Sequence, residues 1–213
     1  MTTPTIASSQ SWVTYLDIDE VKAWLQFPAN ASTAQDPMLQ RVIDMACEWI
    51  SNEINRPVAP TVYTERHDGW SGSQILLNQY PIIELVSCAE YQSTGGFIEL
   101  PESTPENPVD GVQVNYLTGE LGRVFAGYSW SRPFFPGRRN VEVTYIAGYN
   151  PIPPVLWMAT VDLIKYIWVN TQQAAAINKN DIYSSDDTGS ALWAGVPYRI
   201  QSWIAPYRRL VIG

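Results

Sequence analysis

Residues 140–171 decide the fold, and they read NVEVTYIAGYNPIPPVLWMATVDLIKYIWVNT. The first part of this stretch alternates between two sides, and one side carries Val141, Val143, Tyr145 and Ala147. A period of two with β-branched and aromatic residues predicts a strand over 141–149. Three prolines follow, and the last of them, Pro154, suits the first turn of a helix because its missing N–H is not needed there. The stretch therefore predicts a strand that leads directly into a helix over 154–173.

This helix is apolar on nearly every side. Only three residues between 155 and 169 are polar: Thr160, Asp162 and Lys165. Such a helix is buried on several faces, so we expect it to be the centre of a small helical bundle. A membrane span requires about 20 apolar residues, whereas this run is shorter and has Asp162 and Lys165 near its middle, where they can pair on one face. The pattern favours a core helix over a membrane helix.

Two amphipathic helices are predicted upstream, over residues 17–27 and 36–56. Asp17 and Glu20 form a capping-box pattern at the start of the first, and Asp36-Pro37 is a strong start for the second. The second helix has one apolar stripe, which consists of Leu39, Val42, Ile43, Ala46, Ile50 and Ile54. An apolar stripe requires a covering surface, and the helix over 154–173 is the expected one.

The segment 61–149 is predicted to be a β insertion between the second and third helices. Alternation predicts strands over 61–66, 74–77 and 82–91, and the turn at Gly119 predicts a hairpin between 112–116 and 122–125. Residues 92–111 carry three prolines and no clear period, so they are expected to form a surface excursion. The predicted fold class is α+β: a helical bundle around a central buried helix, with an antiparallel hairpin or sheet insertion and an extended C-terminal arm.

Residues 129–137 are aromatic and interrupted by prolines, and we predict a loop there. Two interpretations stay open for Trp130, Phe134 and Phe135. They either pack over the edge of the core or form a contact surface, because aromatic residues dominate interface energetics.

The predicted organisation has three parts: a folded domain over 1–177, a flexible polar linker over 178–195 and a C-terminal docking arm over 196–213. The arm has three arginines and no acidic residue, and its apolar residues follow helical spacing. The residues expected to bind a partner are Arg199, Ile200, Trp203, Ile204, Tyr207, Arg208 and Arg209. The alternative is that the same stripe packs on the chain's own core. A chain ending after Gly195 separates the two, since loss of a docking arm leaves the melting temperature almost unchanged.

The net charge of −8 is unevenly distributed. Residues 1–137 contain 6 basic and 16 acidic side chains, whereas residues 138–213 contain 7 basic and 5 acidic ones. An acidic body argues against binding to nucleic acid through its phosphates. No basic end followed by an apolar run opens the chain, so no signal peptide is expected. Cys47 and Cys88 fall within helical and strand patterns, and we expect two packed thiols in a reducing compartment.

The sequence lacks the usual patterns of an active site. His67 is the one histidine, and it stands beside Asp68 in a Gly-rich turn without a Gly-x-Ser-x-Gly elbow. A hydrolase centred on this pair is a rival hypothesis that lacks a nucleophile. The chain contains no phosphate-binding loop and no cluster of metal-ligating residues. We therefore predict no catalytic residues, no cofactor and no metal.

Several weak motifs occur in a specific order along nearly the whole chain. They are Asp17-Ile-Asp-Glu-Val-Lys-Ala-Trp-Leu25, Asn55-Arg56-Pro57, Asp68-Gly69, Ile75-Leu-Leu77, Tyr80-Pro-Ile82, Gly119-Glu-Leu-Gly-Arg123, Val141 to Tyr149, Ile152-Pro-Pro154, Val196-Pro197 and Ile204-Ala-Pro-Tyr-Arg208. In this order the chain resembles the head–tail connector (adaptor) proteins of tailed phages. It departs from them over 92–111 and 128–137, which leaves the β topology open.

The resemblance implies a structural virion protein without catalytic activity. Such proteins form a ring, commonly of twelve copies, under the portal protein, and they join the capsid to the stopper or tail and continue the DNA channel. The implied location is the virion neck, after synthesis in the cytoplasm of a bacterial host. We expect a monomer or weak association in isolation, no membrane partner, and passage of DNA without sequence-specific binding.

Two other hypotheses stay open. The first is another neck component, such as a stopper or head completion protein. The second is a carbohydrate-binding or surface-binding β domain that uses Trp70, Trp130, Phe134 and Phe135 as a stacking platform. In that case sugar would quench tryptophan fluorescence.

Overall fold

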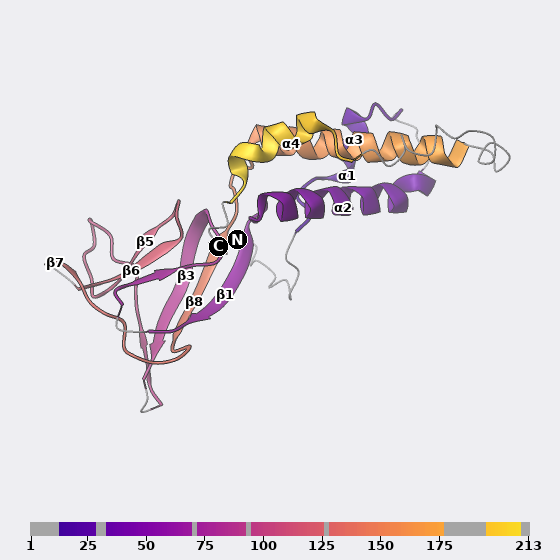
Figure 1. Cartoon of the computed structure of the whole chain (residues 1–213). Helices are drawn as coiled ribbons and strands as arrows, with labels where there is room; N and C mark the ends of the chain where they lie inside the picture. The colour runs from indigo at the N-terminus through magenta and orange to yellow at the C-terminus, as the bar shows by residue number, and fades with distance from the viewer. Residues whose placement is uncertain are drawn as a thin grey trace. The chain divides into compact units, whose positions relative to one another are not determined.

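The computed structural model describes residues 13–28, 33–69, 72–92, 95–125, 128–176 and 195–209. Within them the chain divides into two compact units. Residues 59–150 form a β unit, and residues before 59 and after 150 form a helical unit. Helices and antiparallel sheets are both present, which confirms the α+β class (Figure 1).

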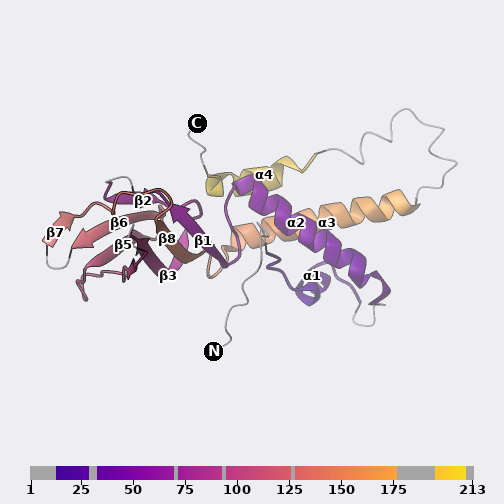
Figure 2. The same cartoon turned by 90° about the horizontal axis from the view of Figure 1, so that it is seen from below.

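The helical unit consists of short and long helices from both ends of the chain. They are α1 (Ile18–Trp24), the 3₁₀ turn η1 (Thr33–Gln35), α2 (Asp36–Ile54), α3 (Pro154–Ala176), α4 (Tyr198–Ile204) and the 3₁₀ turn η3 (Ala205–Tyr207). α3 contacts both α2 and α4, and Figure 2 shows α2 crossing α3 at an angle. The predicted helix over 154–173 is confirmed, and it continues to Ala176.

The core of the helical unit follows directly from the sequence pattern. All six residues of the predicted α2 stripe are buried, and so are Leu156, Ala159, Leu163 and Ile164 of α3. Burying a Leu or Ile side chain contributes about 1.5–3 kcal/mol, so the α2–α3 contact is a principal source of stability in this unit. Thr160 is also buried, and it is satisfied because its hydroxyl bonds the Leu156 carbonyl (2.8 Å) and the Tyr15 hydroxyl (2.6 Å).

The ends of α1 and α2 have local causes. The Asp17 side chain caps α1 by accepting a hydrogen bond from the Asp19 N–H (2.7 Å). α2 has Pro37 in its first turn and ends at Asn55, whose backbone is left-handed (φ 53°). Within the described helices, none is long and apolar enough to cross a membrane.

The β unit contains two antiparallel sheets. The strands are β1 (Thr61–His67), β2 (Gln74–Leu76), β3 (Ile82–Tyr91), β4 (Phe97–Glu99), β5 (Gly111–Asn115), β6 (Glu120–Phe125), β7 (Tyr128–Ser131) and β8 (Val141–Ala147). One sheet has the order β1-β8-β3-β4, and the other has the order β2-β6-β5 with β7 also paired to β6. The predicted hairpin is confirmed, since β5 and β6 pair in register from Gly111↔Val124 to Asn115↔Glu120.

β8 is an inner strand of the first sheet, between β1 and β3. Its burial alternates as predicted, with Val141, Val143, Tyr145 and Ala147 buried. These side chains join a core that draws on both sheets and includes Leu77, Leu121 and Phe134. Gly148 follows β8 with φ 132°, and a Cβ there would lie 2.4 Å from the Ala59 carbonyl oxygen, so the site requires glycine.

Two predictions for the β unit are wrong in part. Residues 92–111 are not wholly a surface excursion, because β4 pairs with β3 and Leu100 enters the core. The segment 129–137 is not wholly a loop, because β7 pairs with β6 there. Both strands are short and lie at sheet edges, where local periodicity is weak and pairing decides the structure.

Candidate partner-binding surface

The C-terminal residues expected to form a docking arm lie in the helical unit. Ile200 and Ile204 of α4 are 1% and 0% exposed, so they pack inside this unit and are not available to a partner. This corrects the prediction for those two residues and matches the alternative that the stripe packs on the chain's own core. Trp203 and Tyr207 are half-buried. Residues 178–194 of the predicted linker and 210–213 of the arm lie outside the described residues.

The three arginines of this segment attach it to α2 and α3. Arg199 forms an ion pair with Asp162 of α3 and lies over the Trp203 ring, 5.2 Å from its centroid. Arg208 forms an ion pair with Glu53 of α2. The backbone N–H of Arg209 donates to the Ile54 carbonyl (2.9 Å), which satisfies one of the acceptors left open at the end of α2.

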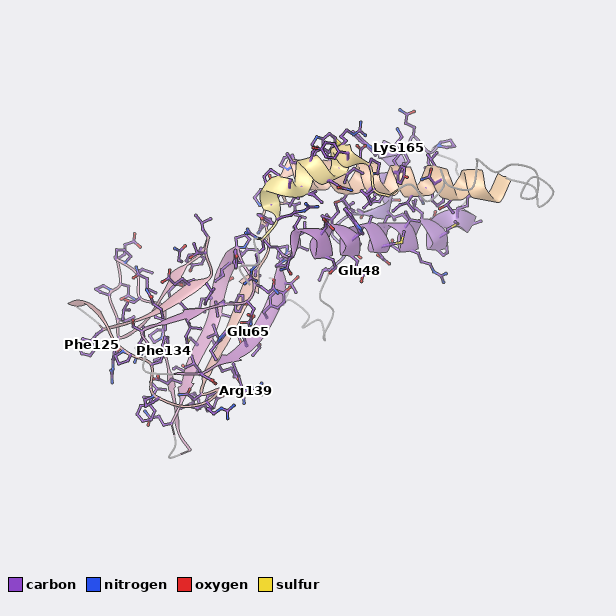
Figure 3. All side chains as sticks on the ribbon, viewed as in Figure 1. Glu48, Glu65, Phe125, Phe134, Arg139 and Lys165 are labelled. Carbon is purple, nitrogen blue, oxygen red and sulfur yellow. The ribbon has the colours of Figure 1, made fainter. Side chains whose placement is uncertain are left out.

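The outer side of α4 borders an apolar hollow of about 290 Å³ that no sequence pattern indicated. It is lined by Pro154, Val155, Met158 and Trp203. Val155 is 41% exposed, and Tyr198 at the start of α4 is 83% exposed. Asp162 and Arg199 line a second, more polar hollow, together with residues that include Lys165 and Val169. Figure 3 labels Lys165 on α3. We call the strip formed by Val155, Met158, Tyr198, Arg199 and Trp203 the α4 flank.

A second exposed surface of the helical unit surrounds α1. Asp17, Asp19 and Glu20 are exposed, and Trp24 is 41% exposed while its ring packs edge-on against Trp157 of α3 (5.7 Å between centroids). We call the strip formed by Asp17, Asp19, Glu20 and Trp24 the α1 flank. Figure 2 shows α1 and α4 on opposite sides of α3.

Of the aromatic residues predicted to form a platform in the β unit, the structure describes the side chains of Phe134 and Phe135. Phe134 is 1% exposed and belongs to the core, which corrects its assignment to a contact surface, and Figure 3 labels it within the β unit. Phe135 is 44% exposed. The Trp130 side chain and all of Trp70 lie outside the described parts of the structure. Of the two described residues, Phe135 alone is accessible to a ligand.

A different aromatic cluster is exposed at the edge of the first sheet. The Tyr91 and Phe97 rings lie 5.9 Å apart, and the Arg66 guanidinium lies 5.5 Å from the Tyr91 ring centroid. Arg66 also forms an ion pair with Glu142 (2.7 Å). Phe97 is 58% exposed. Sequence reasoning missed this cluster because Phe97 becomes Tyr91's neighbour only through the β3–β4 pairing.

His67 and Asp68 do not form a catalytic pair in the described structure. His67 Nε2 lies 2.9 Å from Glu65 Oε2, and Asp68 accepts a hydrogen bond from the Arg139 N–H (2.6 Å). His67 is the last residue of β1 and not part of a turn, and the two adjacent side chains have separate partners. Among the described residues there is also no group of three His, Cys, Asp or Glu side chains that could hold a metal.

Glu65 is the centre of this polar cluster. Its carboxylate accepts hydrogen bonds from the Tyr145 hydroxyl (2.6 Å) and from the backbone and side-chain N–H groups of Asn78 (3.1 and 3.0 Å). Burial alone would raise the pKa of Glu65, but the bonds from His67, Tyr145 and Asn78 lower it below its usual value. Burial and the Glu65 carboxylate raise the pKa of Tyr145, so its hydroxyl stays a donor. The cluster holds the 78–79 loop in place, because Asn78 donates to Glu65 and the Gln79 N–H donates to the Tyr145 hydroxyl.

Comparison with known proteins gives one family and several similar folds. The family model for head completion proteins matches residues 14–210. A chain in the neck of an empty gene transfer agent (GTA) particle computed with C6 symmetry has a TM-score of 0.61 and 15% identity, and the match covers 100% of this chain and 99% of that chain.

Two further structures are similar at the same level. A chain from the neck of the native GTA particle computed with C12 symmetry has a TM-score of 0.58 and 14% identity, with 100% and 99% coverage. A chain from the virion of the native GTA particle has a TM-score of 0.57 and 16% identity, with 93% and 92% coverage. No curated protein matches this chain.

Proposed function

The chain belongs to the head completion protein family, and from this membership we propose that it is a structural protein in the neck of a tailed phage or a related particle. The family match is the main support for the proposal, because the matched residues include both the helical unit and the β unit. The similar folds from GTA necks support the location, since each match extends over nearly the full length of both chains.

More specifically, we propose the adaptor role. Copies of the chain form a ring, of twelve subunits, that binds the portal protein on one side and the stopper or tail completion protein on the other. The C6 and C12 symmetries of the similar neck structures support a ring arrangement. Exposed groups available for the portal and stopper contacts include Arg208 of the helical unit and the Arg66–Tyr91–Phe97 cluster of the β unit.

The ring would continue the DNA channel without binding a DNA sequence. The net charge of −8 supports this role, because an acidic surface disfavours phosphate contacts. Passage of DNA requires a lining to which the duplex does not adhere. Labelled duplexes of unrelated sequence should therefore show equally weak binding in fluorescence anisotropy at physiological salt. Tight binding with preference for one sequence would contradict the channel role.

The experiment that tests the proposal is deletion of the gene followed by imaging of particles. Filled capsids without tails, and recovery of tails on complementation, are the expected results. Tailed, infectious particles formed without the protein would refute a neck function.

Binding order separates the adaptor from the stopper. An adaptor binds portal-bearing capsids as a purified chain, whereas a stopper binds only after the adaptor is in place. Pelleting of the purified chain with portal-bearing capsids, with portal-free shells as the control, distinguishes the two roles.

A further inference from the structure

We propose that the apolar hollow of the α4 flank receives the α1 flank of a second copy of this chain, so that neighbouring copies join head to tail. The inference rests on the proposed ring and names the surfaces that close it. Both flanks belong to the helical unit.

The hollow has the character of a docking site. Its four lining residues, Pro154, Val155, Met158 and Trp203, are all apolar. Tyr198, at the start of the same helix α4, is 83% exposed, and Val155 is 41% exposed. A gathered set of exposed apolar side chains, bordered by a polar residue such as Arg199, is typical of an interaction surface.

The α1 flank offers a matching anchor. Trp24 is 41% exposed, and its edge-on contact with Trp157 holds the ring in place before any partner binds. Tryptophan is enriched among the residues that contribute most to binding, particularly where it enters an apolar pocket. A ring that is already ordered loses little conformational entropy on docking.

Charge identifies the occupant as the α1 flank. Asp17, Asp19 and Glu20 are exposed on α1, and the nearby Lys22 is engaged with Asp36 (2.7 Å). The described residues 195–209 contain three arginines and no acidic residue.

Arg199 is able to take a second partner. Its side chain is 66% exposed although it pairs with Asp162, which is 14% exposed. A guanidinium has five N–H donors, so an incoming carboxylate can bind it without displacing Asp162. Opposite charges across the contact would guide the register of the two copies.

The placement of the flanks requires a head-to-tail contact. On α3, Trp24 touches Trp157, whereas Arg199 pairs with Asp162, and Figure 2 shows α1 and α4 on opposite sides of α3. One pair of molecules cannot join both flanks at once, so each copy keeps one flank free for the next. Such a heterologous contact closes into a ring or continues as a filament.

Cysteine crosslinking in assembled particles tests the contact directly. The full-length chain with Glu20→Cys and Tyr198→Cys together is expected to give a ladder of covalent multimers with a short bismaleimide. Each single variant should stay unlinked, and so should Glu20→Cys with Met45→Cys, since Met45 is 48% exposed and lies on α2, which belongs to neither flank. Cys47 and Cys88 are buried and should not react.

A second pair of variants covers the case in which the double cysteine variant does not assemble. Val155→Glu places a carboxylate in the hollow, and the first turn of a helix tolerates it. Val169→Glu is the matched control, because Val169 has the same 41% exposure on the same helix. We expect Val155→Glu to reduce incorporation into particles at least tenfold, and Val169→Glu to reduce it less than twofold.

The outcomes separate the two proposals. No ladder from particles that contain the double variant, or equal incorporation of the two glutamate variants, overturns the head-to-tail contact and leaves the neck function intact. Absence of the wild-type chain from purified particles overturns the neck function itself.

Discussion

At the scale of single residues, Glu65 has the clearest consequence. It accepts hydrogen bonds from His67, Tyr145 and Asn78, and its side chain is 14% exposed. Glu65→Gln should lower the free energy of unfolding at pH 7 by about 1–3 kcal/mol, because the amide NH₂ meets groups that also donate. Urea unfolding measures the change. Glu142→Gln is the control, since its pair with the half-exposed Arg66 is screened by solvent and contributes little to stability.

The pH dependence of that loss follows from the direction of the pKa shift. The pKa of Glu65 is lowered in the fold, so the contribution is complete above the unfolded value of about 4.3 and is lost as the pH falls through the folded value. The wild type and Glu65→Gln should therefore converge in stability as the pH falls below the unfolded value of about 4.3. A difference that stays constant from pH 7 to pH 3 would show that ionisation of Glu65 contributes nothing.

The two cysteines give a second prediction at this scale. Cys47 is 0% exposed and Cys88 is 3% exposed, and burial raises the pKa of Cys47 to about 11 and that of Cys88 to about 12. The thiolate is the reactive form, so a disulfide reagent at pH 8 should label neither thiol in the native protein and both after denaturation. Rapid labelling of one thiol in the native state would indicate local opening of its helix or strand.

At the scale of elements, α4 stabilises the helical unit. Ile204 is fully buried, so Ile204→Ala should lower the free energy of unfolding by about 2–5 kcal/mol. Tyr198→Ala should change it by less than about 0.5 kcal/mol, because Tyr198 is 83% exposed. For the same reason, a chain ending after Gly195 should melt at a lower temperature. Unchanged melting of Ile204→Ala and of the truncated chain would restore the docking-arm interpretation.

How far the sequence predicts the elements depends on whether their signal is local. The helix beginning at Pro154 and the strand over 141–147 are predictable because many successive residues share one period. β4 is three residues long and forms only by pairing with β3, so no local sequence pattern predicts it. The hollow of the α4 flank is similar: Val155 and Trp203 are 48 positions apart and meet only because α4 packs on α3.

The predicted partner-binding residues show the same limit at finer detail. The sequence of the C-terminal segment shows an apolar stripe with helical spacing. The spacing does not determine whether this chain or another molecule covers the stripe. Ile200 and Ile204 are covered by the chain itself, whereas Arg199 stays largely exposed. In the β unit, Phe134 and Phe135 are adjacent in sequence and differ completely in burial. Only the tertiary structure assigns one to the core and the other to the surface.

At the scale of the whole molecule, the β unit has the features of an independently folding insertion. Its first and last strands pair, with Thr61 opposite Ala147, so the chain enters and leaves the unit at adjacent points. The unit also has its own core, which includes Leu77, Leu121 and Tyr145. We therefore expect residues 59–150, expressed alone, to fold with a β-type circular dichroism spectrum and a single cooperative thermal transition.

Two neighbouring phenylalanines provide the matched variants for this test. Phe134→Ala in the excised unit should lower its free energy of unfolding by about 3–5 kcal/mol, enough to abolish the transition, because Phe134 is 1% exposed. Phe135→Ala should leave the transition within a few degrees, because Phe135 is 44% exposed. An excised unit that is unfolded or aggregated would show that the β strands depend on the helical unit. Equal effects of the two substitutions would contradict the assignment of Phe134 to the core.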